Sequence, residues 1–333
     1  MRRVAASLAL TLGLLFTTAA SSAEPYGIGL EGFAYPYPVT MLALPSEGEA
    51  LRMAYMDVKP AANANGRTVL LLHGRNFPSS YWEPTIKALT AAGYRVVVPD
   101  QVAFGKSSKP VTPLSFDRLA KHTLALLDSL QLQRVDIVAH SMGGMLAVRF
   151  ARSYENRVDR LVLAAPIGLE DYRNFVPPVE TDRIMADEDK LTPDAYRRQL
   201  ITNYSLTLPP DDITPFVEAR MRIKDAADYP RWLRAFVNSY QMIWGQPVVY
   251  EIPQLTQPTL FIMGANDHNA PGRAYAPDPV KPKMGDNARL AQDLAAHMKQ
   301  AKVEVIPNVG HLVHLEAVDR FNALMLSFLN APR

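Results

Sequence analysis

The sequence contains no cysteine among its 333 residues. Without thiols the protein forms no disulfide, carries no lipid on cysteine, uses no cysteine nucleophile and binds no metal through thiolates. An excess of one charge is also lacking, because 35 Lys and Arg residues face 33 Asp and Glu residues, for a net charge of +2. No basic run stands out, so the composition does not suggest nucleic acid or an anionic membrane surface as a partner.

Long apolar runs are missing except for one near the N-terminus. Arg2 and Arg3 precede an apolar stretch over residues 4–16, and a tail of small residues follows it. This order is typical of a secretory signal peptide, so we expect residues 1–23 to be removed by cleavage after Ala23. A membrane anchor is the alternative, but the run is shorter than the ~20 apolar residues that span a bilayer. We therefore expect a periplasmic or secreted bacterial protein without a membrane span.

The rest of the chain alternates between strand and helix patterns. Short apolar stretches with polar boundaries predict strands, and amphipathic stretches between them predict helices. Strands are expected at residues 35–44, 51–58, 68–72, 94–98, 135–139, 158–164, 259–263 and 303–306, and helices at 81–92, 115–130, 142–154, 287–299 and 315–329. The first two strands should form a hairpin. The later alternation predicts an α/β fold, with a parallel sheet and helices on both of its faces.

The alternation breaks after Pro166. Residues 167–254 have a helical pattern, paired prolines and many aromatic residues. We interpret this segment as a helical cap inserted over the edge of the sheet, between a first core part at 24–166 and a second core part at 255–333. Most of its aromatic side chains are expected to form the core of the cap itself.

Ser141 stands between the strand at 135–139 and the helix at 142–154. A serine in a sharp strand-to-helix turn is the context of a nucleophile elbow, in which the hydroxyl is raised above the edge of the sheet. The turn requires small residues two positions before and after the serine. Gly143 meets this requirement, and Ala139 takes the place of the commoner glycine. Read alone, the motif is also compatible with a chance helix cap.

Two further polar residues follow predicted strands in the second core part. Asp267 comes after the apolar strand TLFIM, and His311 comes after VEVI. Because the carboxyl ends of parallel strands meet at one edge of a sheet, Ser141, Asp267 and His311 can meet there. A nucleophile, a base and an acid that orients the base make up a catalytic triad, and this chain order with an elbow is specific to one architecture.

Other residues compete for these positions. His314 is the alternative base, and Asp100 or Asp171 is the alternative acid. His140, beside the serine, is expected to point away from the nucleophile and to be structural. His73 is expected to hold its own loop by hydrogen bonds. The remaining histidines are scattered without ligand spacing, so neither a metal nor a cofactor is expected.

An oxyanion hole needs two backbone N–H groups. Met142, at the positive end of the helix after the serine, is the first candidate. The second donor is expected from the turn after the strand TVLLL, at Arg75 or Asn76. Asn76, Phe77 and Trp82 are the candidate substrate-binding residues, with packing of the first helix as the alternative for the two aromatic side chains.

Five stretches of the chain resemble the α/β-hydrolase superfamily, over nearly all of the mature length. They are LLHG at 71–74, VVVPDQVAFGKSSKP at 96–110, VAHSMGGMLA at 138–147, GAND at 264–267 and VGHLVHLEAVDRFN at 309–322. The chain looks most like the capped branch that contains epoxide hydrolases, haloalkane dehalogenases and meta-cleavage-product C–C hydrolases. The resemblance implies a mixed eight-stranded sheet, a cap after the sixth strand, and Ser141, Asp267 and His311 as the triad. It also implies oxyanion donors at Met142 and Arg75.

The nucleophile separates this chain from part of that branch. Epoxide hydrolases and dehalogenases of the branch use an aspartate, whereas this chain has Ser141. We therefore expect a hydrolase that cleaves small carboxylic esters through an acyl-enzyme, without a cofactor. A C–C bond hydrolase or a lactonase on the same triad is the alternative, and a non-catalytic binding protein is a more distant one.

Overall fold

The computed structural model describes residues 26–44 and 48–332. The expected signal peptide at residues 1–23 lies outside the described residues, as does most of the turn expected between the first two strands. Within the described ranges, no helix combines the length and the apolar character needed to cross a bilayer.

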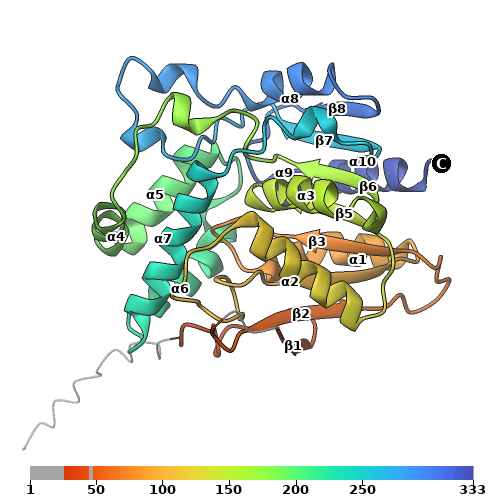
Figure 1. Cartoon of the computed structure of the whole chain (residues 1–333), viewed down its shortest axis with the longest axis horizontal. Coiled ribbons are helices and arrows are strands. Elements are labelled where there is room, and N and C mark those ends of the chain that lie inside the picture. Colours follow the sequence, from red (N-terminus) through yellow and green to blue (C-terminus); the bar gives the residue numbers. More distant parts are fainter. Residues whose placement is uncertain (1–25, 45–47, 333) are drawn as a thin grey trace, which may run out of the picture.

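A sheet of eight strands runs through the molecule in the order β1-β2-β4-β3-β5-β6-β7-β8 (Figure 1). The first two pairings, β1 with β2 and β2 with β4, are antiparallel, and all the others are parallel. The strands are β1 (Val39–Ala43), β2 (Arg52–Val58), β3 (Thr68–Leu72), β4 (Arg95–Pro99), β5 (Val135–His140), β6 (Val158–Ala164), β7 (Thr259–Gly264) and β8 (Ala301–Ile306). The predicted mostly parallel α/β sheet is confirmed.

Helices cover both faces of the sheet, as the apolar strands require. Successive residues of a strand point to opposite faces, and β3 shows this directly. Val69 and Leu71 belong to one hydrophobic core with α1 (Glu83–Ala91) and α10 (Val318–Asn330). Leu70 and Leu72 belong to another core with α2 and α3. These two helices are α2 (Phe116–Ser129) and α3 (Met142–Ser153). A further helix, α8 (Asn287–Ala295), contributes Ala291 to the same core.

The last predicted helix, at 315–329, is divided in two. A short α9 (Val313–Glu316) ends at Ala317, whose φ of −137° and ψ of 56° are not helical, and α10 follows. The Glu316 carboxylate, at the end of α9, accepts the N–H groups of Gly310 at 3.0 Å and Leu312 at 2.8 Å. This carboxylate therefore holds the turn around residue 311.

Between β6 and β7 the chain leaves the sheet and forms four α-helices. They are α4 (Thr181–Asp189), α5 (Pro193–Tyr204), α6 (Thr214–Ile223) and α7 (Tyr229–Gly245), which gather on one side of the sheet, at the left of Figure 1. The C=O of Tyr204, at the end of α5, accepts the N–H of His311 at 2.8 Å. The insertion therefore lies over the carboxyl end of β8, as expected of a cap.

Candidate active site

Ser141 occupies a strained turn between β5 and α3. Its φ of 55° and ψ of −120° lie in a region that non-glycine residues seldom adopt. A side chain on Gly143 would collide with the C=O groups of Leu72 and His73, so only glycine allows the helix to start this close to β3. The sequence therefore builds the sharp elbow that was predicted, with Ser141 only 4% exposed.

The structure brings the three candidate triad residues together. The Ser141 hydroxyl lies 2.9 Å from Nε2 of His311, and Nδ1 of His311 lies 3.0 Å from Oδ2 of Asp267. His311 and Asp267 are buried. With the Nδ1–H of His311 donating to the carboxylate, Nε2 is left as an acceptor that faces the serine.

His314, the alternative base, is not placed for this chemistry. Its ring is buried and packs against those of Tyr81 at 4.6 Å and Trp82 at 4.4 Å. Neither ring nitrogen has a hydrogen-bond partner among the described residues. Burial, with a smaller contribution from His311, lowers the pKa of His314 well below its ordinary value. This residue is therefore a neutral part of the core.

The two alternative acids form hydrogen bonds with other groups and not with His311. Asp100 accepts the Tyr35 hydroxyl at 2.5 Å and the Ser79 N–H at 2.9 Å. Asp171 binds the Arg173 guanidinium at 2.7 Å, at the start of the insertion. Asp267 is the carboxylate that reaches the base.

His140 and His73 have the structural positions expected of them. Nε2 of His140 lies 2.9 Å from the C=O of His311, and Nδ1 lies 3.0 Å from the Tyr81 hydroxyl. Burial lowers the pKa of His140 well below its ordinary value, so the ring is neutral. Nε2 of His73 accepts the N–H of Gln101 at 2.9 Å and so joins the turns after β3 and β4.

Both expected oxyanion donors lie next to the serine. Met142 is the first residue of α3, where a backbone N–H has no partner within the helix. Arg75 and Asn76 line the same cavity as Ser141. Gly74 brings their turn close, because a side chain added there would lie 3.1 Å from Cβ of Ser141.

Ser141 opens into a cavity of about 390 Å³ between the core and the cap. Part of the lining is apolar and is provided by Ile167, Ile184 and Ile243. The charged part contains more cations than anions, and consists of Arg75, Glu188, Arg273 and Lys281. Three buried polar atoms of the lining residues have no partner among the described residues: the Tyr240 hydroxyl, Oδ1 of Asn76 and Nε of Arg273.

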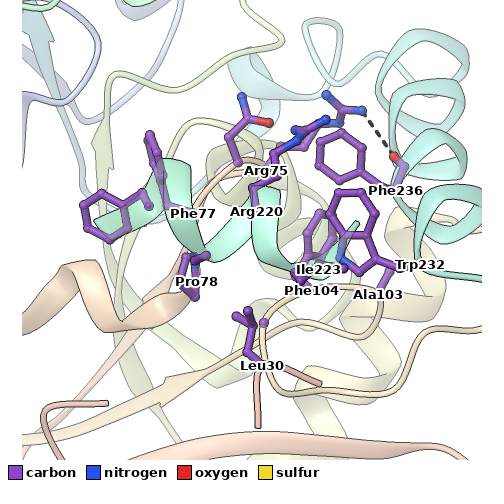
Figure 2. Close-up of a pocket in the computed structure, with 14 residues that line it drawn as sticks. Leu30, Arg75, Phe77, Pro78, Ala103, Phe104, Arg220, Ile223, Trp232 and Phe236 are labelled. Atoms are coloured by element: carbon purple, nitrogen blue, oxygen red, sulfur yellow. Dashed lines mark hydrogen bonds between the residues drawn. The ribbon is translucent and has the colours of Figure 1, made fainter. Parts of the chain in front are cut away.

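A second, smaller cavity of about 40 Å³ shares Arg75 and Asn76 with the first (Figure 2). Its aromatic lining is Phe77, Phe104, Phe216, Trp232 and Phe236. Trp232 and Phe236 of the insertion thus belong to the hydrophobic core, as expected of most aromatic residues in the cap, and also line this cavity.

The three predicted substrate-binding residues have different positions. Asn76 lines both cavities, and Phe77 lines only the smaller one. Trp82 lines neither, because its side chain is fully buried against Tyr81 and His314. The prediction for Trp82 was therefore wrong, and packing of the first helix explains this residue.

Two neighbours of the triad were missed in the sequence. The side-chain amide nitrogen of Asn269 lies 3.2 Å from Nε2 of His311, and its backbone N–H donates to Oδ1 of Asp267 at 3.0 Å. Tyr204 holds His311 through its C=O and also packs against the imidazole ring at 4.6 Å. The position of Asn269, two residues after Asp267, was the only feature of the sequence that could have placed it near the triad. Nothing in the sequence connects Tyr204 with the base.

Comparison with known proteins identifies the family. The profile of the alpha/beta hydrolase family matches residues 69–324. The chain belongs to this family. It is 31% identical over 294 residues to a 2-hydroxy-6-oxononadienedioate/2-hydroxy-6-oxononatrienedioate hydrolase of Pseudomonas putida, with 85% of this chain and 93% of that protein covered.

Solved structures give the same family. A probable hydrolytic enzyme from Pseudomonas aeruginosa is 41% identical, with a TM-score of 0.89 and coverage of 93% of this chain and 99% of that one. A meta-cleavage product hydrolase from Pseudomonas fluorescens is 25% identical, with a TM-score of 0.61 and coverage of 84% and 94%. The chain is an α/β-hydrolase-fold hydrolase.

Proposed function

We propose that this hydrolase cleaves carboxylic esters with Ser141 as the nucleophile. The observation that carries the proposal is the hydrogen-bonded series from Ser141 through His311 to Asp267, at 2.9 Å and 3.0 Å, at the wall of a cavity. A serine whose hydroxyl donates to an oriented imidazole is an activated nucleophile.

The proposed reaction has two halves. His311 takes the proton of Ser141 as the oxygen attacks the ester carbonyl, and the N–H groups of Met142 and Arg75 stabilise the oxyanion. Asp267 stabilises the imidazolium and holds its orientation. His311 then gives the proton to the departing alcohol. In the second half His311 takes a proton from water as the water oxygen attacks the acyl carbon. The bond from Oγ of Ser141 to the acyl carbon then breaks, His311 returns the proton to Oγ, and the carboxylic acid leaves.

The charges of the cavity favour a second candidate, a C–C bond hydrolase that acts on an acidic substrate. Arg75, Arg273 and Lys281 line the cavity with Glu188 as the only carboxylate, within the part of the chain described. The names of the relatives denote hydrolases of dicarboxylates. A guanidinium binds a carboxylate well, because charge-assisted hydrogen bonds are stronger than those between neutral groups. The same triad serves both reactions.

Hydrolysis of p-nitrophenyl esters of increasing acyl length tests the first candidate. Ser141→Ala should lower kcat by at least ~10⁴-fold while the far-ultraviolet circular dichroism stays unchanged. An unchanged rate in this variant would exclude the mechanism. Turnover of a vinylogous diketone dicarboxylate without turnover of any simple ester would instead establish the second candidate.

We also propose that the protein is exported, on the basis of the signal-like pattern of residues 1–23. When all 333 residues are expressed in a bacterial host, the protein should be recovered outside the cytoplasm. Its intact mass should correspond to a chain that starts at Glu24. Recovery of the uncut chain in the cytoplasm would contradict this proposal.

A further inference from the structure

The side chain of Arg75 leaves the active-site turn and enters the cap. Its Nε donates to Oγ of Ser239 at 2.8 Å, and its Nη2 donates to the C=O of Phe236 at 3.2 Å. The guanidinium carbon also lies 3.7 Å from the centre of the Phe236 ring. Figure 2 shows the arginine beside this ring, at the helix that carries it. Two residues of α7 thus hold a side chain whose backbone is the proposed oxyanion donor.

A buried carboxylate from another cap helix joins this contact. Oε1 of Glu188, in α4, lies 3.7 Å from Nη2 of Arg75, and Arg220 of α6 binds its other oxygen. Burial raises the pKa of a carboxyl group, but Arg220 and Arg75 outweigh burial and hold the pKa of Glu188 below its ordinary value. The carboxylate is therefore ionised. Separation of these charges in a buried site is costly, so the three groups stay together.

The next residue of the turn is attached to the cap as well. Nδ2 of Asn76 donates to the hydroxyl of Tyr204 in α5. The same Tyr204 accepts the His311 N–H through its C=O. The oxyanion turn and the base therefore depend on the same end of α5.

The core holds this turn through the preceding residue, Gly74, whose N–H donates to the Tyr81 hydroxyl at 2.8 Å. The last pair of the β3–β5 ladder is Leu72 with Ala139, so Arg75 lies three residues beyond the sheet. An oxyanion hole works only when its donors are fixed where the negative charge develops. We infer that Ser239 and Glu188 are positioning residues, which fix the backbone N–H of Arg75 through its side chain, so that the closed cap completes the oxyanion hole. This inference rests on the proposed function.

A different contact of the same helix provides a matched control. Arg231 of α7 donates through Nε to the C=O of Lys109 at 2.6 Å and through Nη2 to Glu49 at 2.7 Å. It is again an arginine that joins cap and core with two hydrogen bonds. It reaches the loop after β4 and the hairpin rather than the turn beside Ser141. If these contacts only attach the cap to the core, substitution of Arg75 and substitution of Arg231 should change kcat to the same extent.

The test compares Ser239→Ala, Arg75→Met and Arg231→Met with the wild type, on a neutral p-nitrophenyl ester. Ser239 is fully buried and is not among the residues that line the two cavities described, so its truncation changes no contact with substrate. Removal of a whole oxyanion donor costs about 10²–10³-fold in kcat, so displacement of one should cost about 10–100-fold. We expect this loss in Ser239→Ala and Arg75→Met, with KM within about 3-fold of the wild type. Arg231→Met should keep kcat within about 2-fold.

A second readout does not require turnover. An aryl boronic acid forms a tetrahedral adduct with the active serine and places an oxygen in the oxyanion hole. Its inhibition constant should rise in Ser239→Ala by about the same factor as kcat falls, and Glu188→Gln should show a smaller change in the same direction. In Arg231→Met it should not change, even if the melting temperature falls as much as in Ser239→Ala.

The inference is wrong if all three truncations reduce kcat equally, or if kcat falls only in proportion to the melting temperature. It is also wrong if Ser239→Ala raises KM and leaves kcat and boronic acid binding unchanged. Failure of the proposed function is a separate result, in which Ser141→Ala keeps the wild-type rate. Should Arg75→Met fail to fold, Ser239→Ala alone decides between these outcomes.

Discussion

The side-chain amide of Asn269 lies 3.2 Å from Nε2 of His311, the nitrogen that also faces the Ser141 hydroxyl at 2.9 Å. A neutral imidazole with its proton on Nδ1 has one acceptor site at Nε2, so two donors share it. Once Ser141 is acylated it has no proton to donate, and Asn269 stays beside the place where a hydrolytic water must approach. The second half of the reaction should therefore depend on this amide more than the first.

We expect Asn269→Ala to slow deacylation by about 3–10-fold and to change acylation less, because the water loses its orientation and the nucleophile does not. Stopped-flow measurement with p-nitrophenyl acetate should then show a clearer burst followed by a slower steady state. Asn269→Asp tests whether an anion is tolerated at this place. An equal loss in both steps would contradict a selective effect on the water.

Asp267→Asn should lower kcat by about 10⁴-fold with little change in fold. An amide can donate to Nδ1 of His311, which places the proton on Nε2, where it faces the serine and cannot accept. The corresponding changes at Asp100 and Asp171 are the controls, because neither carboxylate contacts the base. A loss below about tenfold in Asp267→Asn would mean that the orientation of His311 has another source.

Arg273→Gln distinguishes the two candidate substrate classes. Nε of Arg273 is buried without a partner among the described residues, in the lining of the cavity that holds Ser141. A hydrogen bond to a charged group contributes about 1.5–3 kcal/mol, so loss of this donor should raise KM for a dicarboxylate substrate by about tenfold or more. KM for a neutral ester should stay within about 2-fold. Equal changes for both substrates would exclude a carboxylate-binding position here.

Asp136 predicts a pH dependence of stability. Burial at the start of β5 outweighs the ion pair with Arg67 at 2.6 Å and raises the pKa of Asp136 from 3.8 to about 6. Between these values the folded state binds more protons than the unfolded state, so the free energy of unfolding falls as the pH rises. The contribution of this group is fully present below pH ~4 and is lost by pH ~6, with an amplitude of up to about 3 kcal/mol.

Urea unfolding of the wild type and of Asp136→Asn between pH 4 and pH 7 checks this sign. The wild type should lose stability relative to the variant as the pH rises through that range. A difference that is independent of pH would mean that folding leaves the pKa of Asp136 unchanged. A wild type that gains stability relative to the variant as the pH rises would show that the Arg67 pair outweighs burial.

The sequence predicted those parts of the site that follow from local patterns. Ser141, Asp267 and His311 each follow an apolar strand within a few residues, and the carboxyl ends of parallel strands share one edge, so their meeting was foreseeable. The contact between Arg75 and Ser239 joins residues 164 positions apart and depends on how the cap helices settle on the core. The positions of the Phe77 and Trp82 side chains could not be predicted either, because they too depend on tertiary packing. Both follow the same strand, but the turn directs one side chain into a cavity and the other into the core, and the residue type is alike in both cases.

The division of the hydrophobic core between the two faces of the sheet has a consequence for biosynthesis. Val69 of β3 packs in the same core as Phe321 and Leu329 of α10. Arg160 also donates to the C=O groups of Phe328 at 2.6 Å and Leu329 at 2.8 Å. A ribosome releases the Ser141 elbow well before it releases α10. The face of the early strands that α1 covers is therefore completed only when α10 has emerged, and the nucleophile meets its base only in a chain that is almost fully synthesised. A nascent chain that lacks His311 has no base beside Ser141, so we expect it to be catalytically inactive until translation is nearly complete.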